Sequence, residues 1–373
     1  MKIIERTIIL SCAAIFLFIV FKAVYNGALS NRSIIKPQSS NYYQIIDKDF
    51  NKTVDLPFTS ITSFRGNSSS IFMSVDHKSP NALDNKVVQY DRMTQKYKTI
   101  FNSKFELPSM QGLELNENWL VWVDADESGW QLNPYFMNLK TKEIQPLTKE
   151  NEEDVFNDFP VLIGDYAAWI KSDRKVEKAE VMLKNLKTND TESIFDLNTY
   201  TFMNMHLSSK DGKILFTDKK NNYGYLYLYD VKSKEIEEIK TNYEFIGWAS
   251  LLNGNQFIYL TFNDPSESST DDQKLLFYNI SNKHTQVVLS DVVTVNSHYT
   301  DFNNQVFFSY NDEGMRKFKV KNNLLVEDGE LNKELETPNF YRLSADNNIY
   351  IINQDLSYEK RKSKLIIQSE LTN

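Results

Sequence analysis

Residues 208–241, with the sequence SSKDGKILFTDKKNNYGYLYLYDVKSKEIEEIKT, decide the fold of this chain. Apolar and polar residues alternate with a period of two, which predicts strands at 213–217, 225–229 and 235–239. Asp211 and Gly212 precede the first strand with turn chemistry, and Asp230 begins a second tight turn. The stretch therefore predicts most of a four-stranded antiparallel sheet.

The first strand of this unit recurs along the whole chain. Counting residues 213–217 there are seven copies, at intervals of 43 to 49 residues. The other copies are residues 71–75, 119–123, 166–170, 257–261, 306–310 and 349–353.

The end of the second strand carries a sharper mark, an Asp or Asn that recurs at intervals of 47, 47, 45 and 49 residues. The marked positions are Asp91, Asn138, Asn185, Asp230 and Asn279. Because the two series of repeats run in phase, a β-sandwich with coincidental spacing is the weaker interpretation.

A sheet of about 45 residues that repeats seven times predicts an all-β, seven-bladed propeller over residues 42–373. A small sheet buries both faces only when it packs between two neighbours. Six blades is the alternative, because the last repeat is short. We expect residues 42–46 to supply the outer strand of the last blade and to close the ring, which removes an exposed edge.

Residues 209–217 and 226–230, SKDGKILFT and LYLYD, resemble the S-x-D-G-K-x-I-x-F-T repeat of TolB-like (WD40-like) propellers. The resemblance implies a propeller that binds other macromolecules in the cell envelope, or one that accompanies a hydrolase domain. It carries no functional residues over to this chain, because the repeat motif is structural.

An apolar stretch lies near the N-terminus, at residues 7–25, with Lys22 as its only charge. Its length predicts a transmembrane helix within residues 1–25 that acts as an uncleaved signal-anchor, followed by a polar linker at 26–41. The propeller would then lie outside the cytoplasm. Secretion after signal-peptide cleavage is the alternative, with Ala28-Leu29-Ser30 as an acceptable site.

The net charge of -8 and the pI near 5.3 give no general attraction for nucleic acid, so none is expected as a partner. The only cysteine, Cys12, lies in the apolar stretch, so no disulfide framework is possible.

In a propeller, the loops from second to third strand and the loops between blades share one face. Aspartates collect in these loops, which predicts an acidic face for a cationic partner or simply a solvated surface. Asp124-Ala-Asp126 begins like a calcium loop but lacks the acid at position 12, so we predict a turn and no metal site. Trp130 could stack on a sugar ring or pack on the neighbouring blade. The candidate binding residues are His77, Asp124, Asp126, Trp130, Asp173, Asp218 and Asp312.

Motif-bearing enzymes are not indicated, since the sequence has no G-x-S-x-G elbow, no phosphate-binding glycine loop and no histidine pair with metal spacing. We therefore expect a non-catalytic scaffold, without catalytic residues or cofactor, that binds a protein or glycan. The alternative is a carbohydrate-active lyase or hydrolase with its site over the central channel, which sequence cannot locate among so many acids.

Overall fold

The computed structural model describes the chain in segments. They are residues 52–58, 60–76, 85–150, 152, 154–199, 206–262, 273–290, 305–309, 315–330, 343–345, 348–355 and 362–369. The chain divides into Met1–Ile45 and Ile46–Asn373, and every described residue belongs to the second unit. The predicted anchor at 7–25, the linker and the predicted strand at 42–46 lie outside the described residues. No described segment forms a helix of the length and apolarity that a membrane crossing requires.

Repeated four-stranded antiparallel sheets make up the structure, so the all-β prediction is confirmed. The first sheet contains β2 (Ser60–Gly66), β3 (Ser70–Asp76), β4 (Lys86–Asp91) and β5 (Lys96–Asn102). The second contains β6 (Gln111–Leu115), β7 (Trp119–Ala125), β8 (Leu132–Asn138) and β9 (Ile144–Pro146). The third contains β10 (Val155–Ile163), β11 (Tyr166–Asp173), β12 (Lys178–Asn185) and β13 (Thr191–Leu197).

The next two sheets follow the same order. They are β14 (Leu207–Lys210), β15 (Lys213–Lys220), β16 (Tyr223–Asp230), β17 (Ile236–Lys240); and β18 (Phe245–Asn253), β19 (Gln256–Phe262), β20 (Lys274–Asn279), β21 (His284–Ser290). A further sheet has three described strands, β22 (Gln305–Ser309), β23 (Met315–Lys321) and β24 (Leu324–Glu330).

The last sheet joins the two ends of the second unit. Its strands are β25 (Leu343–Ala345), β26 (Asn348–Asp355), β27 (Lys362–Ser369) and β1 (Lys52–Leu56). Antiparallel pairing of β1 with β27 runs from Lys52 opposite Ile367 to Leu56 opposite Ser363. The outer strand of the last sheet therefore comes from the beginning of the unit, although from residues later than 42–46.

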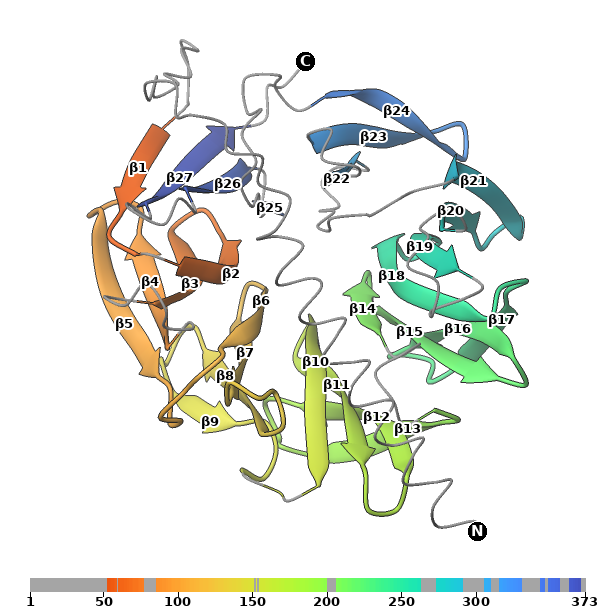
Figure 1. Cartoon of the computed structure of the whole chain (residues 1–373), viewed down its shortest axis with the longest axis horizontal. Coiled ribbons are helices and arrows are strands. Elements are labelled where there is room, and N and C mark those ends of the chain that lie inside the picture. The colour runs from red at the N-terminus through yellow and green to blue at the C-terminus, as the bar shows by residue number, and fades with distance from the viewer. Residues whose placement is uncertain are drawn as a thin grey trace, which may run out of the picture. The chain divides into compact units, whose positions relative to one another are not determined.

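The first strands of successive sheets contact one another on the inner side of the arrangement (Figure 1). The contacts run from β25 to β2, β6, β10, β14 and β18, and β21 contacts β24 of the following sheet. Because β25 of the last sheet touches β2 of the first, the row of sheets returns to its starting point.

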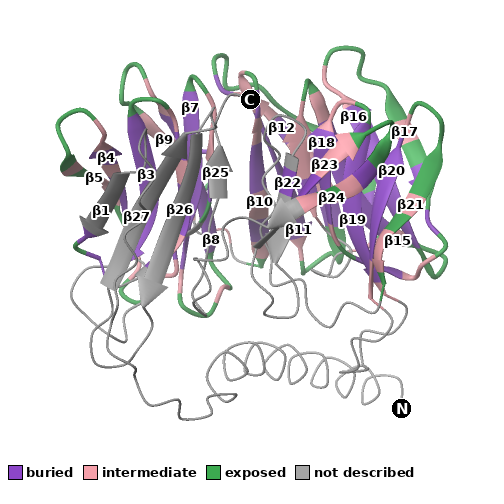
Figure 2. Cartoon of the chain, turned by 90° about the horizontal axis from the view of Figure 1, so that it is seen from above, coloured by how far each residue is buried: buried purple, intermediate pink, exposed green. Residues whose placement is uncertain are grey.

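The residues 208–241 show how the core is divided. In β15 and β16, Ile214, Phe216 and Tyr227 pack into a cluster with strands β11 and β12. Leu215 and Leu226 point the other way, into a cluster with β18, β19 and β20. The period of two thus sends alternate residues into two separate cores. In Figure 2 the buried residues follow the strands, and the exposed ones gather at the turns.

One turn in this stretch is tighter than the predicted loop. Strands β15 and β16 continue to Lys220 and Tyr223, which pair with each other. Asn221 and Asn222 between them have φ of 52° and 62°, the left-handed geometry that two-residue hairpins use and that Asn tolerates. The polar residues from 218 onward are therefore mostly strand.

Candidate functional site

Aspartates of the loops that share one face of the propeller were predicted to lie on a binding face. Asp124 ends in the interior instead, with no exposed surface. Its carboxyl group accepts hydrogen bonds from Ser103 Oγ at 2.6 Å and from Lys104 N at 2.9 Å. Burial raises the pKa of Asp124 above its ordinary value, and the two hydrogen bonds oppose the shift. The residue anchors the chain that enters its sheet.

Asp218 repeats this arrangement in the β14–β17 sheet, where it too is fully buried. One carboxyl oxygen accepts from the backbone and side-chain nitrogens of Asn198 at 2.9 and 2.6 Å, and the other accepts from Thr199 N at 3.1 Å. Both aspartates fasten the connection between sheets, so neither carboxyl group is available to a partner on the surface. The structure corrects their placement on the binding face.

Asp126 and Asp173 remain in surface turns. Asp126 Oδ1 accepts from the backbone nitrogens of Trp130 and Gln131 at 2.9 and 3.0 Å. Asp173 Oδ1 accepts from Lys175 N at 2.9 Å. The half-motif for calcium is thus explained by turn geometry. Among the described residues, no group of three or more His, Cys, Asp or Glu side chains is placed to hold a metal. His77 and Asp312 lie outside the described residues.

Trp130 is exposed, at 45 % of its surface, and it packs on the neighbouring sheet. The Arg174 guanidinium carbon lies 3.5 Å from the centroid of the Trp130 ring and 4.4 Å from that of Phe156. The two rings are 5.5 Å apart, centroid to centroid. A cation stacked on an indole is held in place by the ring quadrupole, so the pair is a preformed surface feature.

Exposed aliphatic side chains lie on the loops beside this stack. Leu107 and Val176 are 57 % and 65 % exposed. The loop that carries Leu107 is fixed to the Trp130 loop, because Glu127 N donates to Leu107 O at 2.7 Å. Val176 follows Arg174 in the turn that Asp173 begins, where Val176 N donates to Asp173 Oδ1 at 3.2 Å. We refer to Leu107, Trp130, Phe156, Arg174 and Val176 as the Trp130 patch.

A lysine of the preceding connection, Lys104, balances part of the charge of the acidic loop between the second and third sheets. Lys104 Nζ lies 2.8 Å from Glu150 Oε1. Hydrogen bonding to Lys104 holds the pKa of Glu150 below its ordinary value. Tyr135 lies beneath, and burial raises its pKa to about 12. The predicted acidic face is therefore less uniformly charged than the sequence indicates.

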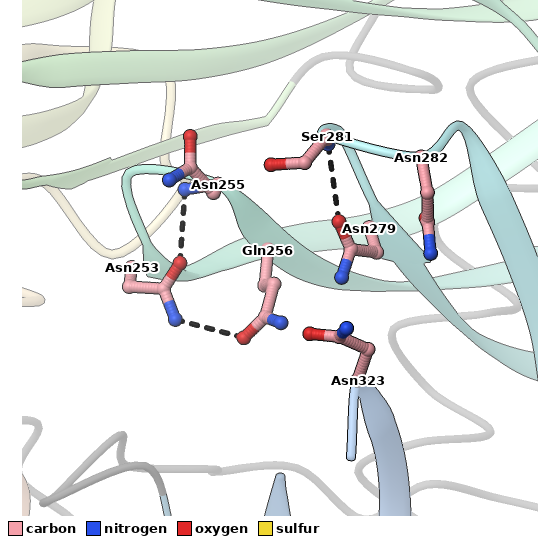
Figure 3. A pocket seen from close by; sticks show the side chains of 7 residues that line it. All are labelled: Asn253, Asn255, Gln256, Asn279, Ser281, Asn282 and Asn323. Carbon is pink, nitrogen blue, oxygen red and sulfur yellow. Dashed lines mark hydrogen bonds between the residues drawn. The ribbon is translucent and has the colours of Figure 1, made fainter. Parts of the chain in front are cut away.

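A polar hollow of about 360 Å³ lies on the opposite face, between the β18–β21 and β22–β24 sheets (Figure 3). Its wall comes from the β18–β19 and β20–β21 turns and from the β23–β24 turn. All its lining residues are polar and uncharged: Asn253, Asn255, Gln256, Asn279, Ser281, Asn282 and Asn323. Of these residues only Asn279 carries a sequence signal, as a turn marker.

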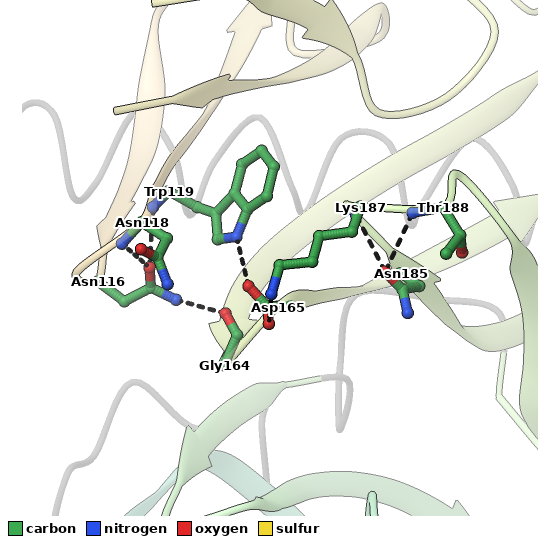
Figure 4. Close-up of polar contacts among 8 residues, drawn as sticks. All are labelled: Asn116, Asn118, Trp119, Gly164, Asp165, Asn185, Lys187 and Thr188. Carbon is green, nitrogen blue, oxygen red and sulfur yellow. Dashed lines mark hydrogen bonds and ion pairs between the residues drawn. The ribbon is translucent and has the colours of Figure 1, made fainter. Parts of the chain in front are cut away.

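The corresponding turns of the β10–β13 sheet are bridged by charge (Figure 4). Lys187 Nζ lies 2.5 Å from Asp165 Oδ2, and Trp119 Nε1 of the preceding sheet donates to Asp165 Oδ1 at 3.1 Å. The ion pair and this bond hold the pKa of Asp165 below its ordinary value. Asn116 Nδ2 completes the link to Gly164 O at 2.8 Å.

Two titratable groups lie on or directly before the neighbouring inner strands β10 and β14. Asp158 lies in β10 at a bulge, and burial raises its pKa to about 6. His206 directly precedes β14, and burial lowers its pKa to about 4. The Phe159 and His206 rings are 6.0 Å apart, centroid to centroid. A carboxyl group whose pKa lies near neutrality is suited to acid–base chemistry. The bulge in β10 that holds Asp158 is a feature that the sequence pattern does not reveal.

Comparison with known proteins identifies the fold. No family model and no curated protein matches this sequence. The structure of U3-55K matches at a TM-score of 0.57 and 11 % identity, over 85 % of this chain and 98 % of that one. The WD40 domain of Toxoplasma gondii coronin matches at a TM-score of 0.52 and 10 % identity, over 87 % of each chain. The chain has the β-propeller fold.

The propeller also resembles part of a longer enzyme. The Pyrococcus horikoshii acylaminoacyl peptidase matches at a TM-score of 0.55 and 11 % identity, over 84 % of this chain and 52 % of that one. The predicted WD40-like resemblance is confirmed at the level of the fold. Since enzymes and other proteins share this fold, the function has to be argued from the sites.

Asp218→Ala is expected to destabilise the propeller by about 3 kcal/mol or more, because it leaves buried backbone and amide donors without an acceptor. The matched control is Asp173→Ala, which removes an acceptor from a surface turn and should cost about 1 kcal/mol or less. Urea unfolding of both variants measures the difference. Equal costs would contradict the interior role of Asp218.

The pH dependence of stability tests the Asp158 and His206 pair. In Asp158→Asn only His206 remains, whose folded pKa lies below the unfolded value of 6.5, so stability should be lost as pH falls from about 6.5 to about 4. In His206→Gln only Asp158 remains, whose folded pKa lies above the unfolded value of 3.8, so stability should be lost as pH rises from about 4 to about 6.

Each of these effects is at most about 3 kcal/mol, and they oppose each other in the wild type. Unfolding free energies measured across this pH range should therefore vary less in the wild type than in either variant. Parallel pH profiles for the two variants would show that one of the assigned pKa shifts is wrong.

Proposed function

We propose that this chain is a seven-bladed, membrane-anchored propeller outside the cytoplasm that binds a protein partner through the Trp130 patch and performs no chemistry. Residues 7–25 would supply the anchor, with secretion after cleavage as the alternative. The seven described sheets and the return of β1 to β27 support seven blades, with six as the other possible count.

The observation that carries the proposal is the stacked Arg174 and Trp130, together with exposed Leu107 and Val176. Trp and Arg are the residue types most enriched among those that dominate binding energy at protein interfaces. The stack fixes both side chains before a partner arrives, which lowers the entropy cost of association. Both are held by neighbouring sheets, so they form one rigid surface.

Charge around the patch indicates the kind of partner. Asp126 and Glu127 belong to the Trp130 loop, and Asp154 O accepts from Arg174 N at 2.9 Å. A surface with an apolar centre and an acidic surround fits a partner with an apolar anchor flanked by Lys or Arg. Exposed Leu107 and Val176 beside the stack suit a protein partner better than a glycan.

Trp130→Ala and Arg174→Ala should each weaken partner binding about 30-fold, because each removes half of the stack. Tyr223→Ala is the matched control. Tyr223 is also an exposed aromatic residue of the same set of loops, with Lys240 Nζ 3.6 Å from its ring centroid, but it belongs to another sheet.

The measurement is co-purification from membranes with the tagged full-length chain, followed by titration of the captured protein. The proposal predicts loss of the partner in the Trp130 and Arg174 variants and its retention in the Tyr223 variant. Two results would exclude a protein interface at this patch. One is a partner that all three variants retain, and the other is a glycan that the wild type captures and the Trp130→Ala variant does not.

A carbohydrate-active lyase or hydrolase is the second candidate, and Asp158 is the observation that favours it. Its pKa of about 6 would let it both give and take a proton near neutral pH. If this candidate is correct, the chain cleaves polysaccharide and Asp158→Asn abolishes cleavage while the fold is retained. Reducing-end release by wild type and variant measures this. Equal release by both would remove Asp158 from any catalytic role.

A further inference from the structure

The hollow on the opposite face contains amide groups whose orientation is fixed. Asn253 Nδ2 donates to Gln256 Oε1 at 2.9 Å, and Ser281 N donates to Asn279 Oδ1 at 3.0 Å. A backbone N–H can only donate, so the oxygen of Asn279 has to face Ser281 and its nitrogen has to face away. Asn255 N donates to Asn253 Oδ1 at 2.9 Å, so the nitrogen of Asn253 faces Gln256 and the oxygen of Gln256 has to accept from it.

The free ends of these amides point into the hollow. Figure 3 shows the side-chain nitrogens of Gln256 and Asn279 on the side that faces Asn323. Gln256 and Asn279 are 9 % and 3 % exposed, and the hydrogen bonds given above engage the oxygens of their amides. The nitrogens therefore line the hollow as donors of fixed direction, which points to a ligand that accepts from them.

A comparison with the β10–β13 sheet shows that the hollow is not inherent in the repeat. Asn279 and Asn185 hold the same marker position, each accepting from the backbone of the residue two further along. Asp165 and Lys187 form an ion pair in the β10–β13 sheet. At the corresponding sequence positions the β18–β21 sheet has Asn255 in place of Asp165 and Ser281 in place of Lys187. The neutral side chains of Asn255 and Ser281 form no ion pair across the two turns, so the space between the turns is left open as the hollow.

We propose that this hollow binds a single unit of an uncharged sugar, independently of the partner at the Trp130 patch. Sugar hydroxyl and ring oxygens accept from fixed amide nitrogens, and the hydroxyl groups can donate to Asn323 and Ser281 in return. Among the described residues the lining has no Lys or Arg to balance an anion, and its surface is mostly polar, which gives a hydrophobic ligand little to bind. Its volume is at the lower end of small-molecule sites, which fits one sugar unit.

The test uses the full-length chain in a detergent without a sugar headgroup. Glucose, galactose and N-acetylglucosamine are the probes, followed by ligand-detected NMR titration. Asn279→Asp keeps the oxygen that accepts from Ser281 N and removes the nitrogen that faces the hollow. Asp230 already occupies the marker position in the β14–β17 sheet and accepts from Lys232 N, the residue two further along, so the fold should tolerate the change.

At least one probe should bind the wild type, and Asn279→Asp should weaken that binding at least about tenfold. The matched control is Asn185→Asp, the same change at the same marker position outside the hollow, and it should leave binding unchanged. A double variant, Asn255→Asp with Ser281→Lys, installs the ion pair of the β10–β13 sheet and should abolish binding while thermal stability is maintained.

Three results would overturn the proposal. The first is that none of the three sugars binds. The second is that Asn279→Asp and Asn185→Asp weaken sugar binding equally. The third is that inorganic phosphate displaces the bound sugar at a concentration below that of the sugar. The last result would show that the amide nitrogens select an anion. None of these outcomes bears on the Trp130 patch, which lies on the other face.

Discussion

The structure depends on burying both faces of sheets that are too small to fold alone. The residues of β15 and β16 show this most directly, since alternate side chains enter two different cores. Each sheet therefore stabilises two neighbours and is stabilised by both. Such a row cannot end without exposing an apolar face and an unpaired strand edge. Pairing of β1 with β27 solves both problems, because it ties the beginning of the unit into its last sheet.

This constraint also explains where the acidic residues lie. The connection between two sheets has to be held in place, and buried Asp124 and Asp218 do so by accepting from the backbone of the incoming chain. A carboxyl group can accept several hydrogen bonds at once, which suits a loop whose amide groups have no strand partner. The loops so fixed present the Trp130 patch on a rigid support, and this is how function is usually carried by propeller loops.

The two candidate binding sites illustrate how a repeat fold can diversify. The turns of the β10–β13 and β18–β21 sheets have the same Asn marker and the same backbone bond. One set of turns carries an ion pair and the other carries amides around a hollow. Both sheets keep the marker and its backbone bond although the flanking side chains differ, so these side chains vary without a change in that bond.

By itself the sequence determined the all-β class, the repeat length and the WD40-like fold, because burial on a sheet imposes a period of two and the repeat imposes its spacing. It also predicted that Trp130 could pack on the next blade, as Arg174 and Phe156 show.

Only the tertiary structure decided which aspartates are buried, that Arg174 stacks on Trp130, and that Asn255 and Ser281 border a hollow. These facts join residues of different sheets or of different turns. Their side-chain types are ordinary for loops, so no local pattern distinguishes Asp124 in the interior from Asp126 at the surface. Closure of the last sheet by an early strand was predicted, but from residues 42–46 instead of Lys52–Leu56. Which early segment pairs with β27 is decided by contacts between residues more than 300 positions apart, and local periodicity does not specify it.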